Sequence, residues 1–347
     1  MPATPAFDFL ALTQADNEER LLRHCADILA QHGMREHCYF DRHRANQAHG
    51  IALHWRADVD PSRVLADIVA HAKSEPGAPD IRFVPMVEDT RAVLAGVFGG
   101  RDSVDTFRAF SFDSAPLLWQ WCDAGLGLPN KRMAVSVEVL VDYMYRMRFR
   151  LAGKGAPPYP GMFVSFRSHF EGFAASLDDP QSAERAFAQR YPAIEKLLLE
   201  LAPAYETHRG TQAPPWLVPW QGLVDGYFDD IHKRVLDNTL VTGMMDEIHR
   251  SGKNLLASSF HEKVVSSKEY TRHTMKQPLF QTNRVLLGLV YLSLFRLGLP
   301  LIERYFLCYA LSRFIQERFN VSAEQAFDRS VQRSARRRRL SWLGIHQ

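Results

Sequence analysis

One phenylalanine-rich segment carries the side chains best suited to chemistry, FVSFRSHFEGF at residues 163–173. On a helix, Ser165, Ser168 and His169 would share one stripe, because residues three and four apart lie on the same face. An imidazole can transfer protons near neutral pH, and hydroxyls can hold a substrate. The stripe therefore predicts three catalytic residues on a pocket wall. A core helix whose histidine bonds a neighbouring hydroxyl is the open alternative.

The remaining side chains of this segment fall on other stripes. Arg167 and Glu171 are four residues apart, the spacing of a helical ion pair, and we expect Arg167 to contact substrate. Aromatic rings can form the walls of a binding groove. The aromatic residues predicted to line it are Phe163, Phe166, Phe170, Trp216 and Trp220.

A second candidate is QPLFQTNRVLLGLVYLSLF, residues 277–295, where polar side chains interrupt an apolar helix. Gln281, Arg284 and Tyr291 lie on or near one helical face. A buried arginine is costly unless it is paired or faces a wet cavity. We predict Gln281 or Tyr291 as the catalytic group opposite His169, and Arg284 as a substrate ligand. An ion pair that ties Arg284 to an acidic side chain is the alternative.

Motifs for metals and nucleotide cofactors are weak or missing. Asp225, Asp229 and His232 have a spacing that could hold a metal, although solvated acidic faces are commoner. His261 begins HEKVV, which lacks the second histidine of the zinc motif H-E-x-x-H. The sequence has no Walker loop, dinucleotide fingerprint or G-x-S-x-G elbow. We therefore expect neither a cofactor nor a metal.

Composition indicates a globular protein without a nucleic-acid or membrane partner. The 347 residues are 46% hydrophobic, and 42 basic side chains nearly balance 39 acidic ones. The four cysteines form no C-x-x-C pair, which fits reduced thiols and a cytoplasmic location. The most apolar run, 285–295, ends at Arg296, short of the roughly 20 residues of a membrane span. We interpret it as a buried core helix.

The N-terminal part mixes helices and strands. Apolar residues at helical spacing predict a helix over 17–32, and Asp60-Pro61 opens another. Residues 37–57 predict a β-hairpin, because Ile51, Leu53 and Trp55 alternate with polar residues and would form one dry side. A short strand is expected near 81–84.

Helices dominate from about residue 115. Ser114 is expected to cap one of them. Others are predicted over 133–149, after Asp179-Pro180 and after Pro278. The fold class is α+β, an N-terminal antiparallel sheet with helices joined to a mostly helical C-terminal half. We expect a single domain over 1–347, with an α/β half at 1–112 and a helical half at 113–347.

Three stretches together resemble a known family. They are the hairpin CYFDRHRANQAHGIALHWRA, the region 83–121 with Gly99-Gly100 and Phe110-x-x-Asp113-Ser114, and TNRVLLG at 282–288. In order and spacing they resemble the C-terminal elimination domain of lantibiotic dehydratases and its stand-alone relatives in thiopeptide biosynthesis. The resemblance covers roughly residues 37–325.

The resemblance implies one of two chemistries. Elimination domains remove glutamate from glutamylated Ser or Thr of a precursor peptide. Thiopeptide pyridine synthases join two dehydroalanines by a formal [4+2] aza-cycloaddition, closing a macrocycle and then expelling water and the leader peptide. The elimination branch has histidines before its Asn-Arg pair, where this sequence has Leu279 and Gln281. FRSHFEGF beside APPYPG is also similar to the pyridine synthases. We therefore favour the cyclase, with a stand-alone glutamate lyase or a non-catalytic leader-binding partner as alternatives.

The resemblance also implies roles and partners. His169, with Ser165 or Ser168, would help one amide become its iminol tautomer, with Tyr291 or Gln281 opposite. The partner would be a ribosomally made precursor peptide with a leader; other pathway enzymes and a second copy of the chain are further possibilities. Leaders in such systems are often acidic, so we expect docking on basic side chains. The residues predicted for it are Arg42, Arg44 and Arg56, or the tail at Arg336–Arg339.

Overall fold

The computed structural model describes eight stretches of the chain, residues 7–13, 17–45, 48–74, 80–85, 101–151, 158–208, 213–240 and 258–342. The strands are β1 (Phe7–Thr13), β2 (Cys38–Ala45), β3 (Ala48–Trp55) and β4 (Asp80–Pro85). The N-terminal helices are α1 (Glu18–Gln31), η2 (Arg35–His37) and α2 (Ser62–Ser74). The others are α4 (Arg101–Asp123), α5 (Arg132–Leu151), α6 (Phe163–Ala174), α7 (Pro180–His208), α8 (Val218–Leu236), α10 (Ser259–Ser266), η4 (Tyr270–Thr274), α11 (Pro278–Arg296), α12 (Leu301–Phe319) and α13 (Ala323–Trp342). The α+β class is confirmed.

The four described strands form one antiparallel sheet in the order β2-β3-β1-β4. The predicted hairpin is confirmed as β2 and β3, with Cys38 opposite Trp55. Ile51, Leu53 and Trp55 are buried, as the alternation requires. The strand expected near 81–84 is β4, whereas β1 was not predicted.

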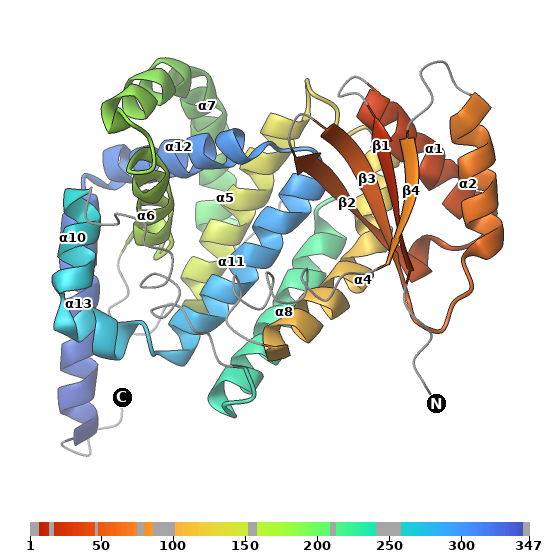
Figure 1. The fold of residues 1–347 in the computed structure, drawn as a ribbon. Helices are drawn as coiled ribbons and strands as arrows, with labels where there is room; N and C mark the ends of the chain where they lie inside the picture. The colour runs from red at the N-terminus through yellow and green to blue at the C-terminus, as the bar shows by residue number, and fades with distance from the viewer. Residues whose placement is uncertain are drawn as a thin grey trace.

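Helices α1 and α2 pack on each other beside this sheet, at the right of Figure 1. Both were predicted. α1 buries an apolar stripe that includes Leu22, Cys25 and Leu29. Asp60 caps α2, since its carboxylate accepts a hydrogen bond from the backbone N–H of Ser62 at 3.0 Å. These helices close one side of the α/β half.

Helix α4 joins the two halves and corrects one prediction. It runs unbroken from Arg101 to Asp123, so Ser114 is not an N-cap; its hydroxyl donates to the carbonyl of Ser111 one turn earlier. Buried Phe110 and Trp119, on either side of Ser114 in the sequence, hold this part of the helix in the core, which outweighs the local capping preference. Helix α4 therefore begins before residue 113, where the helical half was predicted to start.

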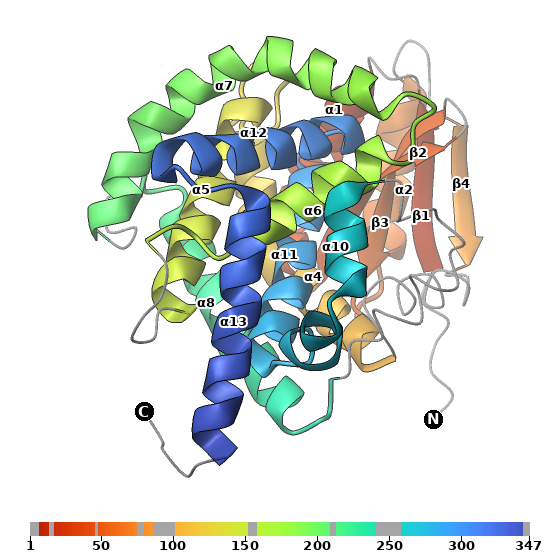
Figure 2. The ribbon, with the colours of Figure 1, turned by 90° about the vertical axis from the view of Figure 1, so that its left-hand side faces the viewer.

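Helix α11 passes through the middle of the helical half, with α8 on one side and α7 arching above α12 (Figure 2). Its apolar run is a buried core helix, as predicted. Within the described residues, no helix combines the length and the hydrophobicity that crossing a bilayer requires.

A buried polar network fastens the sheet to α11. The Arg296 guanidinium donates to Asp41 at 2.7 Å and to the Ser111 hydroxyl at 2.9 Å. Burial opposes ionisation of Asp41, but the Arg296 charge and the His54 hydrogen bond lower its pKa to about 2. Arg42 donates to the Arg296 carbonyl at 2.6 Å and pairs with Glu18. This network therefore joins the α/β half to the helical half through buried hydrogen bonds and ion pairs.

This burial corrects the leader-docking prediction for Arg42, whose side chain is only 1% exposed. Arg42 is an internal tie and offers no surface to a peptide. Arg56 remains partly exposed, although it lies over the Phe112 ring at 4.7 Å. The side chains of Arg44 and of the tail beyond Arg336 lie outside the described residues, as do Gly99-Gly100 and part of APPYPG.

Candidate active site

Helix α6 spans Phe163–Ala174 and confirms the predicted helix, but its phenylalanines face the core. Phe163 and Phe166 are fully buried, and Phe170 packs at 5.0 Å from the Tyr309 ring of α12. Their assignment as walls of a substrate groove is therefore wrong in this structure. An apolar core on one side of α6 leaves its polar stripe on the other.

Arg167 also lies away from the predicted site. It forms the expected ion pair with Glu171 and lies over the Phe170 ring at 5.5 Å. Together with side chains of α7 and α12 it lines a polar pocket of about 270 Å³. Because Arg167 faces these helices, it does not share a surface with His169, and its predicted contact with substrate is not supported.

The predicted meeting of α6 with α11 does occur. The Tyr291 hydroxyl lies 3.2 Å from Nδ1 of His169, and the two rings meet edge to face with centroids 5.5 Å apart. On its other side, the same hydroxyl lies 3.2 Å from Sγ of Cys308 on α12. If the thiol donates to Tyr291 and the hydroxyl donates to Nδ1, all three groups are satisfied and the imidazole proton lies on Nε2.

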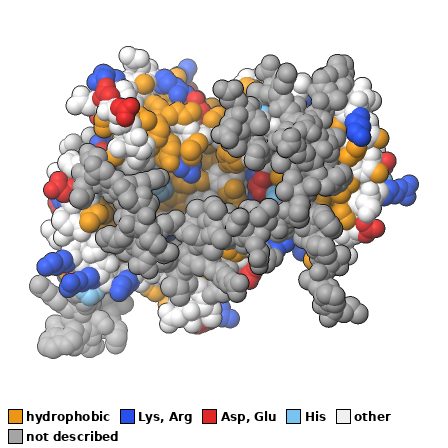
Figure 3. Space-filling view, in the orientation of Figure 1, with side chains coloured by type: hydrophobic (Ala, Val, Ile, Leu, Met, Phe, Trp, Pro, Cys, Tyr) orange, Lys and Arg blue, Asp and Glu red, His pale blue; other side chains and the backbone are white. Residues whose placement is uncertain are grey.

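One stripe of α11 opens toward this pair. Most of the helix is buried, but residues at helical spacing are partly exposed: Gln281, Arg284, Gly288, Leu292 and Phe295. On α6, Ser165, Ser168 and His169 are partly exposed in the same way. Figure 3 shows a recess over α6 and α11, lined mainly by hydrophobic side chains, with a histidine and a basic side chain at its edge. The two stripes therefore face a shared recess.

The position of Arg284 follows from its neighbour Asn283. The Tyr143 hydroxyl donates to the Asn283 side-chain oxygen at 2.7 Å, and the Asn283 amide lies 2.7 Å from the sulfur of Met162. This anchors the asparagine in the core. Arg284, one residue on, turns to the partly exposed side, where its charge acts on His169.

Electrostatics keep the central pair neutral. Burial, with a smaller contribution from the positive charges of Arg304 and Arg284, lowers the pKa of His169 to about 3. Burial likewise raises the pKa of Tyr291 far above its usual value and that of Cys308 to about 11. At neutral pH the site therefore presents an uncharged imidazole and hydroxyl beside two guanidinium groups.

Two residues of the site were not foreseen. The Arg304 guanidinium stacks over the Tyr291 ring at 5.1 Å. Nε2 of His261, on α10, lies 2.9 Å from the Ser168 hydroxyl. Gly172 lies beside this imidazole, and a Cβ at that position would be in ordinary van der Waals contact with its Cε1, at 3.4 Å. The sequence could have signalled His261 only as a histidine flanked by serines and phenylalanine.

The tryptophans predicted to line the groove lie elsewhere. Trp220 is only 1% exposed and packs between Trp121 and Phe110 of α4. Trp216 stacks edge to face on Trp121 with centroids 5.1 Å apart. Trp220 belongs to the α4–α8 interface, so its assignment as a substrate ligand is wrong in this structure. Trp216 lies just before α8 and is partly buried against Trp121, which gives no support to its predicted contact with substrate.

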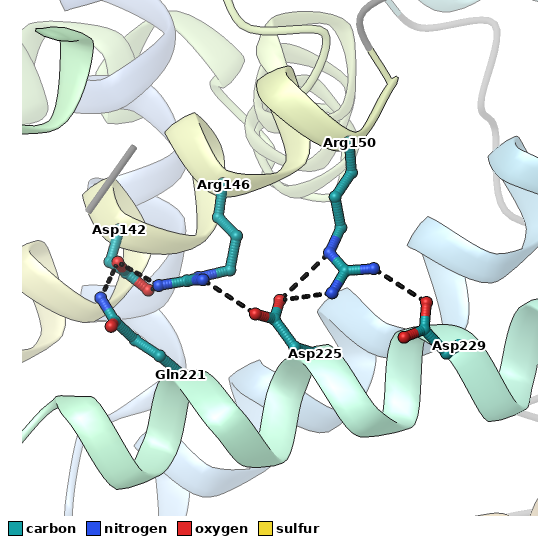
Figure 4. Close-up of polar contacts among 6 residues, drawn as sticks. All are labelled: Asp142, Arg146, Arg150, Gln221, Asp225 and Asp229. Atoms are coloured by element: carbon teal, nitrogen blue, oxygen red, sulfur yellow. Dashed lines mark hydrogen bonds and ion pairs between the residues drawn. The ribbon is translucent and has the colours of Figure 1, made fainter. Parts of the chain in front are cut away.

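The possible metal ligands serve another purpose. Asp225 pairs with Arg146 at 2.9 Å and with Arg150 at 3.0 Å, and Asp229 pairs with Arg150 at 2.8 Å (Figure 4). His232 instead contacts the Thr282 hydroxyl at 3.1 Å. These carboxylates fasten α8 to α5 through arginines, and no group of possible metal ligands occurs within the described residues.

The chemistry available here is uncharged hydrogen bonding and short-range proton transfer. A neutral imidazole of low pKa is a weak base, so it suits tautomerisation better than removal of a carbon-bound proton. Two guanidinium groups can stabilise negative charge that develops on a substrate oxygen. Gln281 lies ten residues from Tyr291, roughly 15 Å along the helix, at the far end of the recess.

Comparisons with known proteins give a structural likeness only. No protein-family model matches the sequence, and neither does any curated protein. The crystal structure of TsrL superposes with a TM-score of 0.71 and 18% identity, over 93% of this chain and 98% of that one. TbtD, the pyridine synthase from thiomuracin biosynthesis, gives 0.53 and 15%, over 91% and 100%. The chain therefore has the fold of TsrL and TbtD along nearly its whole described length.

Proposed function

We propose that this protein is a thiopeptide-type cyclase. It joins two dehydroalanines of a leader-bearing precursor peptide by a formal [4+2] aza-cycloaddition and then releases water and the leader. The fold that it shares with the pyridine synthase TbtD supports this reaction class. The observation that carries the proposal is the neutral His169–Tyr291 pair at the recess between α6 and α11.

The recess would act first by positioning. Bringing two alkenes of a flexible peptide into contact can lower the barrier by several kcal/mol, within the roughly 7–11 kcal/mol that orientation can supply. The partly exposed stripe of α11, with Leu292 and Phe295 at one end and Gln281 at the other, gives an elongated and largely apolar surface for such a peptide.

His169 would then act on one amide. An amide becomes an azadiene when its proton moves from nitrogen to oxygen, which gives the iminol. His169 gives its Nε2 proton to the amide oxygen, while the Ser165 hydroxyl takes the N–H proton and passes its own proton back to Nε2, so both side chains end as they began. Tyr291, bonded to Nδ1, keeps the imidazole in this tautomer. Arg284 and Arg304 stabilise charge that builds on the oxygen.

A low pKa for His169 also separates this reaction from glutamate elimination. Elimination must remove a proton from carbon, for which an imidazole of pKa about 3 is poorly suited. Ring closure, the step assigned to His169, needs only a shift of protons between heteroatoms.

Two peptides test the proposal. The protein is incubated with a leader-bearing peptide that contains two dehydroalanines, and separately with the glutamylated precursor of that peptide. A product that lacks the leader and one water, formed from the first peptide alone, is the expected result. Loss of glutamate from the second peptide would refute the proposal in favour of a lyase. No change in either peptide would refute it in favour of a leader-binding protein.

A further inference from the structure

A second histidine, His261, lies beside the candidate active site and contacts one of its hydroxyl groups. His261 is 6% exposed, and its Nε2 lies 2.9 Å from the hydroxyl of Ser168. Ser168 is the residue before His169 on α6, so one turn of that helix presents two separate hydroxyl–imidazole pairs, Ser168–His261 and Tyr291–His169. The two imidazoles come from different helices, α10 and α6. They are electrostatically coupled, since positive charge on His261 lowers the pKa of His169.

The other nitrogen of His261 is unusual. Nδ1 is buried and has no hydrogen-bond partner among the residues that the structure describes. Buried polar atoms are almost always paired, so an unpaired one in a recess calls for an explanation. An imidazole with one free nitrogen can change tautomer or protonation state without breaking a second bond.

Charge and burial both act on the His261 ring, which packs beside Gly172 of α6. Glu171 favours the charged imidazole, whereas burial disfavours it and is the larger effect, so the pKa of His261 lies below its usual value. The pair is thus uncharged at rest, and a carboxylate is near enough to stabilise an imidazolium that forms briefly.

We propose that Ser168 and His261 form a second proton-transfer pair, which serves the loss of water after ring closure. This assignment rests on the proposed cyclase function. Ring closure leaves a hydroxyl on the former amide carbon. To lose water, that C–O bond breaks with its electron pair on oxygen, and the oxygen takes a proton.

The electrons that replace the C–O bond come from the ring. A ring C–H bond next to the new C=N unit breaks, its proton goes to solvent water, and its electrons shift through the C=N unit to displace the hydroxyl. Ser168 gives a proton to the leaving oxygen, His261 restores the Ser168 proton through Nε2, and the imidazole takes a proton back from solvent. One proton is given and one is taken, so the net change is the loss of one water and nothing is oxidised or reduced.

Two rates measured in one single-turnover experiment separate this role from a structural one. Ring closure consumes both alkenes, which is followed by the loss of thiol-reactive sites on the peptide. Leader release follows water loss and is measured by mass. The variants are His261→Gln and Ser168→Ala, and His273→Gln is the matched control, because His273 is an exposed histidine of η4.

His261→Gln is expected to consume the alkenes at a rate close to that of the wild type. Its leader release should be slower by about 100-fold, within the 10²–10⁴-fold contribution of proton transfer. A cyclised intermediate of unchanged mass, with the leader attached, should accumulate. Ser168→Ala should do the same, and it carries the test if the first variant misfolds, because it removes a single hydroxyl.

Three results would overturn the assignment. Leader release by both variants at the rate of His273→Gln would show that the pair does not act. Equal slowing of both rates would show that His261 only supports the shape of the site. A wild-type protein that leaves the alkenes untouched would instead refute the proposed cyclase function, and the assignment with it.

Discussion

Replacing His169 by glutamine should remove a specific part of the pH dependence of stability. The imidazole has a pKa of about 3 in the folded protein against 6.5 for the ordinary group. Below pH 6.5 the unfolded chain therefore binds a proton that the folded protein refuses, and the free energy of unfolding falls as the pH falls toward 3. Each pH unit in this window costs up to ~1.4 kcal/mol.

From pH 6.5 to pH 5 the loss from this one group approaches about 2 kcal/mol. Glutamine cannot be protonated, but its amide can still bond the Tyr291 hydroxyl. His169→Gln should thus be similar to the wild type in stability at pH 7.5 and lose less stability at pH 5. Urea unfolding followed by tryptophan fluorescence at both pH values gives the two differences. His261 and the other histidines contribute equally to both proteins, so they cancel in the comparison.

Equal pH dependence in the wild type and His169→Gln would refute the account of the site as a pair that stays neutral in the folded protein. It would mean that the His169 ring is solvated well enough to take a proton in the folded protein. A steeper dependence in the variant would have the same meaning.

Three further substitutions test other parts of the structure. Tyr291→Phe removes the hydroxyl 3.2 Å from His169 and should lower turnover about 100-fold with little change in peptide affinity; unchanged turnover in the mass assay would contradict it. Arg296→Met leaves Asp41, which is 27% exposed, still paired with His54, and should lower the free energy of unfolding in urea by about 1.5–3 kcal/mol; a loss below about 0.5 kcal/mol would show that the junction does not depend on this pair. Trp216→Ala should lower the melting temperature but leave turnover unchanged, because this ring packs on α4. A loss of turnover without a change in melting temperature would instead indicate that Trp216 contacts the substrate.

The fold could be predicted where local pattern and tertiary burial agree. Alternation located β2 and β3, and helical spacing located α1, α6 and α11. Helix α4 could not be delimited, because Ser114 has the local chemistry of a cap and only the packing of Phe110 and Trp119 carries the helix past it. Packing against residues distant in the sequence thus outweighed the preference of Ser114 for the start of a helix.

The candidate site was likewise predictable only where the local sequence pattern was enough. The polar stripe on α6 and the Tyr291 face of α11 were visible as polar residues in apolar helices, and their contact across the fold is as predicted. Which face of α6 meets the core was not visible, so Phe166 and Arg167 were placed in the wrong surroundings. His261 is 93 residues from Ser168, and no local motif marks it.

Arg42 could have been placed correctly. It follows Cys38 and Phe40 at alternate positions of β2, which puts it on the dry face opposite Ile51. Its positive charge suggested a surface, but Glu18 and the Arg296 carbonyl supply the partners that burial requires.

The central claim is that the recess between α6 and α11 is where the two dehydroalanines react. The most direct measurement compares the wild type with His169→Ala on the leader-bearing dehydroalanine peptide, with turnover read by mass and affinity by fluorescence anisotropy. The account predicts that turnover falls by about 100-fold or more while the peptide Kd stays within about threefold. Turnover by His169→Ala at the wild-type rate would contradict it.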